Sequence, residues 1–226
     1  MTDMLAGKVI AVTGAAGVLG AAVTRVLAGH GARVLAIDYA GEIPDAGQDE
    51  SHPGVDLSDA AATDKLFAKL GGGLHGLANV AGGFNWVTVA DAGAEEWERL
   101  FRLNVVTTVN ACRAALPALT AAGGAIVNVG AAATAKAAAG MGPYTATKSG
   151  VSRLTEALAE ECKDKGVRVN AVLPTIIDTA VNRADMPDAE FDRWVSPEAL
   201  GEVIAFLLCD RANAVTGALV PVAGRV

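Results

Sequence analysis

The stretch TGAAGVLG, residues 13–20, follows a short apolar run and leads into an amphipathic segment. It carries glycines at every third position, which are Gly14, Gly17 and Gly20. In a dinucleotide-binding turn, such glycines allow the tight turn, the close approach of a pyrophosphate, and the packing of the next helix on the sheet. A glycine triplet also occurs in ordinary strand-to-helix turns, but the strand and helix expected around this one favour dinucleotide binding.

The second apolar run supports this interpretation, because it ends in Asp38 at the spacing expected for a ribose-binding acid. A carboxylate accepts hydrogen bonds from ribose hydroxyls and repels a 2′-phosphate. Tyr39 and Ala40 follow it without a cation, and Arg33 lies at the opposite end of the run. The sequence therefore predicts NAD as the cofactor, with NADH preferred over NADPH.

Short apolar runs alternate with amphipathic stretches along the rest of the chain, which is typical of an α/β sheet with helices on both faces. The strands are expected at residues 8–14, 32–38, near 52–59, 74–82, 124–130, 167–174 and 218–224. The helices are expected at residues 18–29, 58–70, 94–121, 143–165 and 197–209. We therefore predict a single-domain Rossmann fold over residues 1–226, with a doubly wound parallel sheet of about seven strands in the order 3-2-1-4-5-6-7.

The composition limits the possible partners. The chain has 226 residues, 52% of them hydrophobic, and a formal charge of −7. Without a basic surface we expect no nucleic-acid partner and no membrane partner, and a small-molecule substrate instead. The N-terminus is acidic where a signal peptide is basic, and we expect no apolar run long enough to span a bilayer. The three cysteines form no CxxC pair, so we expect no disulfide framework and no metal, and a reducing cytoplasm suits the chain.

Several motifs occur in one order along the chain: TGAAGVLG, Asp38, VDLSD (55–59), NVAGG (79–83), FRLNVV, YTATK and LPTIIDT (173–179). By these motifs the chain resembles the short-chain dehydrogenase/reductase family over nearly its whole length, which implies an NAD(P)-dependent oxidoreductase. The resemblance places Asp56 and Leu57 beside the adenine, and Ile176 and Thr179 at the nicotinamide carboxamide. The cofactor-binding residues that it implies are Gly14, Gly17, Leu19, Gly20, Asp38, Asp56, Leu57, Asn79, Ala81, Gly82, Lys148, Pro174, Ile176 and Thr179.

Two positions depart from the family pattern. Val18 stands where a glycine is usual, so the spacing is GxxGxxG in place of GxxxGxG. Thr175 replaces the glycine that normally follows Pro174.

Tyr144 and Lys148 lie four residues apart on an expected helix, so their side chains share one face. A phenol titrates near pH 10, and proton exchange at neutral pH requires a neighbouring cation such as Lys148. Lys148 can also bind the nicotinamide ribose. In the family, an asparagine at the place of Asn104 lies at a helix kink and continues the proton relay. These three residues are the expected catalytic group, and the alternative is an exposed Tyr–Lys pair with a surface asparagine.

Ala131 stands where the family normally has a serine that hydrogen-bonds the substrate oxygen. The lost donor corresponds to about 2–4 kcal/mol of alkoxide stabilisation. Thr134 or a water molecule could replace it, or the substrate could form no alkoxide at all. A quinonoid dihydropteridine is such a substrate, because hydride enters a conjugated imine and Tyr144 would protonate a nitrogen.

The segment VLPTIIDTAVNRADMPDAEFDRW, residues 172–194, is similar to the substrate loop of the dihydropteridine reductases within this family. The turn GxxGxLG, the sequence VAGG and Ala131 agree with that branch, whereas Asn104 has no counterpart there.

We therefore expect a substrate loop at about 175–196. The residues expected beside the substrate are Ala131, Trp86, Met186 and Trp194. The alternative is a lid helix in which Met186, Phe191 and Trp194 only pack.

Three functions stay open at this point. The first is an NADH-dependent reductase of quinonoid dihydropteridine-like substrates, and the second is an ordinary alcohol or ketone dehydrogenase. The third is a catalytically silent NAD-binding protein, which the presence of Tyr144, Lys148 and Asn104 argues against. The resemblance also implies a homodimer or homotetramer formed through the helices at 94–121 and 143–165.

Overall fold

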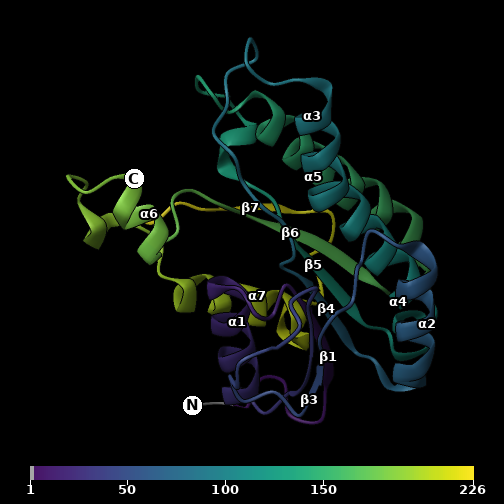
Figure 1. Ribbon diagram of the computed structural model, residues 1–226. Helices are drawn as coiled ribbons and strands as arrows, with labels where there is room; N and C mark the ends of the chain where they lie inside the picture. The colour runs from purple at the N-terminus through teal and green to yellow at the C-terminus, as the bar shows by residue number, and fades with distance from the viewer. Residues whose placement is uncertain (1–2) are drawn as a thin grey trace.

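The computed structural model describes residues 3–226 and has seven strands in one sheet, in the order β3-β2-β1-β4-β5-β6-β7 (Figure 1). All neighbouring strands pair in parallel. The predicted single-domain Rossmann fold and its strand order are therefore confirmed. The strands are β1 (Val9–Thr13), β2 (Arg33–Ile37), β3 (Glu50–His52), β4 (Gly76–Asn79), β5 (Ala125–Val129), β6 (Arg168–Pro174) and β7 (Leu219–Val222).

β3 is the strand whose place was predicted wrongly. It lies at the edge of the sheet, where Glu50–His52 pairs with residues 35–37 of β2, ahead of most of the predicted range 52–59. Its side chains are partly or fully exposed, so a short edge strand of this kind carries no apolar run that a sequence pattern could detect. The loop after it ends at Asp59, whose carboxylate accepts hydrogen bonds from the first amides of α2.

Helices cover both faces of the sheet (Figure 1). α1 and α7 lie on one face, and α2, α4 and α5 lie on the other. The helices are α1 (Val18–Gly29), α2 (Ala60–Leu70), α3 (Ala94–Phe101), α4 (Thr107–Ala122), α5 (Gly142–Cys162), α6 (Ala180–Asp185) and α7 (Pro197–Leu208). The helix predicted over 94–121 is present as α3 and α4, which a π-helical turn at Arg102–Val106 joins.

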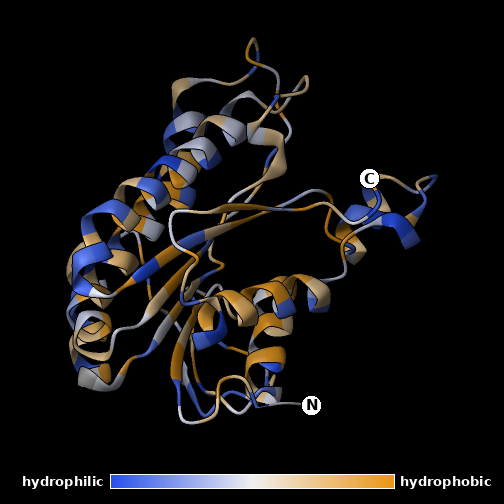
Figure 2. Cartoon of the chain, turned by 180° about the vertical axis from the view of Figure 1, so that it is seen from behind, coloured by the Kyte–Doolittle hydropathy of each residue, from blue (hydrophilic) through white to orange (hydrophobic). Residues whose placement is uncertain are grey.

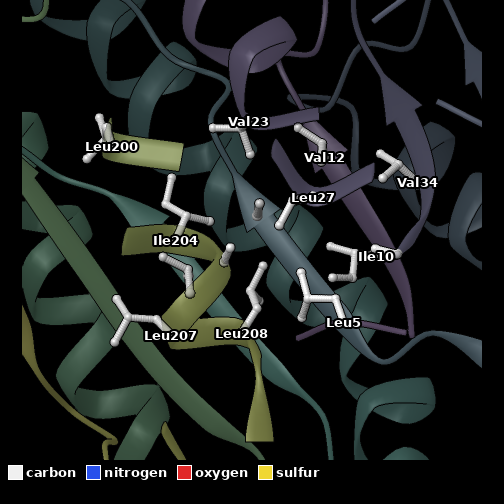
Figure 3. Close-up of a cluster of buried hydrophobic side chains, with 14 of the residues drawn as sticks. Leu5, Ile10, Val12, Val23, Leu27, Val34, Leu200, Ile204, Leu207 and Leu208 are labelled. Atoms are coloured by element: carbon white, nitrogen blue, oxygen red, sulfur yellow. The ribbon is translucent and has the colours of Figure 1, made fainter. Parts of the chain in front are cut away.

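Apolar side chains fill the space on each side of the sheet. On one side, Val23 and Leu27 of α1 pack with Ile204 and Leu208 of α7 and with the strands (Figure 3). Figure 2 shows hydrophobic residues along the strands and on α1 and α7, whereas the segment around α6 is more hydrophilic. Burying such side chains provides the main stabilisation of the fold and holds the strand ends rigidly in place.

A row of buried polar side chains crosses the centre of the sheet. Asn79 Nδ2 of β4 donates to Asn128 Oδ1 of β5 at 2.9 Å and to Cys112 Sγ at 3.2 Å. Asn128 Nδ2 in turn donates to Thr155 Oγ1 of α5 at 2.9 Å. Burial raises the pKa of the Cys112 thiol to about 12, so this cysteine stays protonated and unreactive.

The span Ala94–Ala122 is long and apolar enough to cross a bilayer by length and composition, and 44% of its most apolar window is buried. The prediction that no apolar run is long enough to span a bilayer is therefore wrong by the criterion of length and composition. Leu100, Ala111 and Leu119 in this span are fully buried. Its apolar side thus packs against the protein core, as in any amphipathic core helix.

Candidate active site

The Gly-rich turn after β1 packs directly against the end of β4. Gly14 has a φ of +69°, and a Cβ there would lie 2.7 Å from both Cα and N of Ala81. Thr13 Oγ1 accepts hydrogen bonds from Val80 N at 3.1 Å and from Ala81 N at 3.2 Å. The strand order reverses between β1 and β4, and in open α/β sheets ligands bind outside the strand ends at that point.

The other two glycines of the turn differ in what surrounds them. A Cβ at Gly20 would lie only 1.9 Å from Gly14 O, so the packing of α1 on the turn requires this glycine. A Cβ at Gly17 would lie 3.4 Å from the same oxygen, which is an ordinary contact. Gly17 immediately precedes α1 and has a φ of −75°, so neither packing nor backbone conformation demands a glycine there. Its small size instead leaves the amino end of α1 open to an anionic group.

A cleft of about 680 Å³ opens in front of this turn. Many of the predicted cofactor-binding residues line it, and they come from the loops after the four strands β1 to β4 and from the start of α1. Those residues are Gly14, Gly17, Leu19, Gly20, Asp38, Asp56, Leu57, Ala81 and Gly82. The cleft therefore has the place, size and lining expected for a nucleotide.

Asp38 lies at the wall of this cleft, directly after β2. Its Oδ2 accepts a hydrogen bond from Ala16 N at 2.9 Å, and its Oδ1 accepts one from Ala40 N at 2.8 Å. The carboxylate is thus held in one orientation by two backbone amides. Each carboxylate oxygen can accept more than one hydrogen bond, so ribose hydroxyls can still bind there.

The remaining walls of the cleft include residues that the sequence analysis missed. Leu103 and Thr107 come from the π-helical turn and the start of α4, and Arg99 and Arg102 come from the end of α3 and the same turn. Arg102 Nη2 donates to Ser58 Oγ at 3.1 Å across the cleft mouth. No local motif marks these residues, because they reach the cleft only through the packing of the α3–α4 span.

Asn104 lies at the centre of the π-helical turn and is fully buried. Its Oδ1 accepts a hydrogen bond from Gly83 N at 2.9 Å, and its Nδ2 donates to Gly83 O at 3.0 Å and to Thr147 Oγ1 at 3.0 Å. The alternative of a surface asparagine is therefore wrong. A π-helical turn often marks a functional site, and here it directs an amide between the loop after β4 and helix α5.

Tyr144 lies in the first turn of α5, where its ring meets Phe84 edge-on at 4.9 Å between centroids. Thr147 Oγ1 donates to Tyr144 O at 2.7 Å and so links the backbone at Tyr144 to Asn104. Burial raises the pKa of Tyr144 to about 12. The expected lowering of this pKa by Lys148 is thus not present in the structure, because the loss of hydration dominates for the phenolate.

Lys148 is buried on the next turn of α5, and its Nζ donates to Val129 O at the end of β5 at 2.8 Å. Burial lowers the pKa of the ammonium group to about 8. A Cβ at Gly82 would lie 2.7 Å from Asn104 Oδ1 and 3.1 Å from Lys148 Nζ. Gly82, Asn104 and Lys148 therefore meet at one end of the cleft, within one helical turn of Tyr144.

Ala131 is buried two residues after β5, and its methyl group supplies no hydroxyl in place of the missing serine. Thr134 Oγ1 donates to Ala131 O at 2.8 Å, within a short 3₁₀ turn at Ala132–Thr134. The proton of this hydroxyl therefore points to the backbone, so Thr134 is not placed as a substitute donor.

The predicted substrate-side residues lie in two separate places. Trp86 is 60% exposed and its ring covers Gly140, where a Cβ would come within 2.1 Å of the indole. Met186 directly follows α6, and in Figure 1 this helix is set apart from α3 and α5. Trp194 is buried and meets Phe191 at 4.9 Å between ring centroids, as the packing alternative predicts. The segment is only partly helical, with α6 followed by a 3₁₀ turn at Phe191–Arg193.

Five predicted cofactor residues are not among those that line the cleft: Lys148, described above, and the four that follow. Asn79 turns its side chain into the sheet toward Asn128, and Pro174 ends β6. Ile176 O accepts a hydrogen bond from Val195 N at 3.0 Å, and Thr179 Oγ1 caps α6 by accepting one from Asn182 N at 3.2 Å. Their roles at the nicotinamide end stay predictions.

Residues 8–190 match the short chain dehydrogenase family. The chain belongs to that family. Its members are oxidoreductases that use a nicotinamide dinucleotide, so this chain is an enzyme of that class.

Named relatives of this short-chain dehydrogenase act on alcohols and diols. The cis-4-hydroxycyclohexanecarboxylate dehydrogenase of Sinomonas cyclohexanicum is 34% identical, with 99% of this chain and 98% of the relative covered. The 2,5-dichloro-2,5-cyclohexadiene-1,4-diol dehydrogenase LinX of Sphingobium indicum is 31% identical with the same coverage. The D-threitol dehydrogenase of Mycolicibacterium smegmatis is 32% identical, with 95% and 90% covered. None of these three is a dihydropteridine reductase, so the resemblance to that branch stays a prediction.

The fold of this short-chain dehydrogenase also matches a solved structure, the Cj0485 dehydrogenase, with a TM-score of 0.89. The two chains are 18% identical, and the match covers 99% of this chain and 95% of the other. This likeness concerns the fold alone.

The buried ammonium of this short-chain dehydrogenase should make its stability depend on pH. Between the folded pKa of about 8 and the ordinary value of 10.5, the unfolded chain binds more protons, so the free energy of unfolding rises with pH. The rise should reach about 3 kcal/mol, and Lys148→Met should lack it. Urea unfolding at pH 7.5 and pH 10, with both proteins free of cofactor, measures the difference. Parallel pH profiles for the two proteins would contradict the burial of a charged Lys148.

Proposed function

We propose that this enzyme transfers hydride from NADH to a quinonoid dihydropteridine-like acceptor, with Tyr144 as the proton donor. The observation that carries the proposal is the absence of a hydroxyl donor after β5. Ala131 has none, and the proton of Thr134 is directed to Ala131 O at 2.8 Å. An acceptor that develops no alkoxide needs no such donor.

The protonation of the site fits reduction. With a pKa of about 12, the Tyr144 phenol is protonated at neutral pH and is in the right state to give a proton to an acceptor nitrogen. The bound nicotinamide supplies the hydride. Lys148 and Asn104 lie beside Gly82 at one end of the cleft. There Lys148 can bind a ribose hydroxyl, and it can supply a new proton to Tyr144 after Tyr144 has given up its own.

A second candidate function is favoured by the comparisons. The relatives named above oxidise alcohols or diols, so an ordinary secondary alcohol or ketone substrate is the alternative. In that case an ordered water or the substrate's own geometry has to supply the interaction that the family serine normally makes.

Ala131→Ser separates these two candidates. A restored donor contributing about 2 kcal/mol should raise turnover of a cyclic ketone by at least about tenfold if alkoxide stabilisation is what the site lacks. Pterin reduction should stay level or fall, since the added hydroxyl meets no developing alkoxide. NADH oxidation is followed with quinonoid dihydropterin and with a panel of cyclic ketones, for the parent protein and the variant. We would abandon the pterin proposal if the variant reduces ketones while the parent protein fails to reduce the pterin.

We also propose that the enzyme prefers NADH over NADPH, which rests on Asp38 at the cleft wall. Two arginines line the same cleft, but Glu96 holds Arg99 through two hydrogen bonds of 2.7 Å, and Arg102 donates to Ser58 Oγ. The hydrogen bond with Arg99 is the main reason that the pKa of Glu96 is lowered to about 2. Neither guanidinium is therefore free to receive a 2′-phosphate without giving up its present partner.

Asp38→Ala tests this preference. The parent protein should bind NADH at least about tenfold more tightly than NADPH, because the carboxylate repels the 2′-phosphate, and the variant should lose most of that ratio. Fluorescence titration with both dinucleotides measures it, and Arg102→Ala is the comparison variant, in which the ratio should persist. Equal affinities of the parent protein for the two dinucleotides would rule out the assignment.

We further propose self-association of the chain through the outward side of α3, α4 and α5. Phe101 is 51% exposed and Val109 is 37% exposed on this side, and a shallow cleft of about 500 Å³ lies there between Trp97, Phe101 and Ala146. A second copy of the chain is the proposed occupant, in a homodimer or homotetramer, and light scattering measures this directly. Three free, buried cysteines are compatible with the proposed cytoplasmic location.

A further inference from the structure

Thr175, the residue that departs from the family pattern after Pro174, is bound to the segment that follows β7. Its N donates to Val222 O at 3.2 Å, and its Oγ1 donates to Ala223 O at 2.9 Å. A glycine at position 175 would keep the hydrogen bond to Val222 O but would lose the side-chain hydrogen bond to Ala223 O. The start of the predicted substrate loop is thus fixed by a side chain as well as by the backbone.

The same segment holds the return of the substrate loop. Arg225 N donates to Arg193 O at 2.9 Å, and the Arg193 guanidinium donates twice to Arg225 O, at 2.9 and 2.6 Å. Arg225 Nη2 donates to Asp192 O at 2.6 Å and to Asp192 Oδ2 at 3.0 Å. Gly224 has a φ of +62°, and a Cβ there would lie 2.6 Å from Arg193 O. The contact is therefore close as well as polar.

The two ends of the loop also pair with each other. Val195 N donates to Ile176 O at 3.0 Å, and Asp178 N donates to Val195 O at 2.8 Å. Within the loop, Arg183 pairs with Asp178 through hydrogen bonds of 2.6 and 2.7 Å. The Arg183 guanidinium also lies over the Phe191 ring, 4.9 Å from the ring centroid. In Figure 1 the C-terminal end lies beside α6, and both are set apart from α3 and α5.

We infer that residues 223–225 form a clasp that fixes the base of the substrate loop, and that Thr175, Arg193 and Arg225 are positioning residues for substrate binding. The loop's assignment to the substrate rests on the proposed function. Arg225 and Asp192 are 68% and 78% exposed, so their ion pair contributes little to global stability. The clasp instead restricts the few backbone positions from which the rest of the loop extends. Loosening it should act locally on the loop and on substrate binding.

Hydrogen–deuterium exchange tests the clasp without a substrate. Arg225→Ala and Thr175→Gly should each raise the exchange rate of amides 177–191 by about fivefold, while the exchange of the central strands and the Tm stay as in the parent protein. Thr175→Ser, which keeps the hydroxyl, should behave as the parent. Arg33→Ala removes another exposed arginine–carboxylate pair, with Glu50 at the far end of β2, and should leave the loop unchanged.

Kinetics with quinonoid dihydropterin provide the second measurement. Arg225→Ala and Thr175→Gly should raise KM for the acceptor by about fivefold with kcat within about twofold, because loop placement is lost and proton donation is not. Parent-like loop exchange in both variants, or an equal rise in Arg33→Ala, would overturn the clasp. If the parent protein fails to reduce the pterin while loop exchange rises as expected, the proposed function fails and the clasp stands.

Discussion

Tyr144→Phe is expected to lower turnover by about 10²–10⁴-fold, because the substitution removes only the proton that the acceptor must receive. The ring itself remains, so its edge-on contact with Phe84 at 4.9 Å and the packing of α5 should persist. NADH affinity should change little, since Asp38, the Gly-rich turn and Lys148 are untouched. Steady-state oxidation of NADH with quinonoid dihydropterin and with cyclic ketones measures the loss.

The matching control is a fluorescence titration of NADH into the same variant, together with its Tm. If Tyr144→Phe keeps its turnover on the acceptor that the parent protein reduces, another group donates the proton and the assignment of Tyr144 is wrong. If turnover and NADH affinity fall together, the effect lies in binding, and Tyr144 is a structural part of the cofactor site.

Gly20→Ala and Gly17→Ala should separate folding from cofactor binding at the same turn. The Gly20 methyl would lie 1.9 Å from Gly14 O and 2.7 Å from Gly14 C, and both atoms are backbone that no rotamer change can move. We expect a loss of about 3–5 kcal/mol in the free energy of unfolding. Gly17→Ala adds its methyl at 3.4 Å from Gly14 O, so the Tm should stay within a few degrees.

Gly17 nevertheless lines the cleft at the amino end of α1, where a pyrophosphate has to approach the backbone and an added methyl would take up space. NADH affinity of Gly17→Ala should therefore fall by at least about tenfold, which corresponds to ~1.4 kcal/mol. Thermal unfolding and NADH titration of both variants provide the two readouts. A stable Gly20→Ala protein would contradict the close packing of α1 on the turn, and unchanged NADH binding by Gly17→Ala would place the pyrophosphate elsewhere.

The parts of the molecule that could be predicted from sequence are those fixed by local sterics and periodicity. The turn at residues 13–20 and the position of Asp38 after β2 follow from spacing alone, and both line the cleft. The edge strand β3 could not be placed, because its side chains bury too little apolar surface to leave a pattern. The hydrogen bond of Arg225 to Asp192, which belongs to the clasp, joins residues far apart in the chain. No local sequence pattern predicts it.

Electrostatic properties were the least predictable part of the site. A Tyr and a Lys on one helical face suggested a lowered phenol pKa, yet burial raises the pKa of Tyr144 and lowers that of Lys148. Both shifts depend on how many groups surround each side chain, which spacing along a helix does not contain. The same holds for Thr134, whose hydroxyl direction is set by the short 3₁₀ turn and not by its distance in sequence from Ala131.

The buried amide row of Asn79 and Asn128 has a consequence for how the sheet assembles. The two residues stand directly opposite each other on β4 and β5, and each amide finds its partner only in that alignment. A slip of one of these strands by one residue would turn its amide to the other face of the sheet and leave polar groups unpaired in an apolar layer, at a cost of several kcal/mol. Apolar residues in the same places would tolerate such a slip with much less penalty. The amides thereby act as a register lock, which ensures that the ends of β4 and β5, and with them Gly82 and the carbonyl that receives Lys148, come to the same level in every folded molecule.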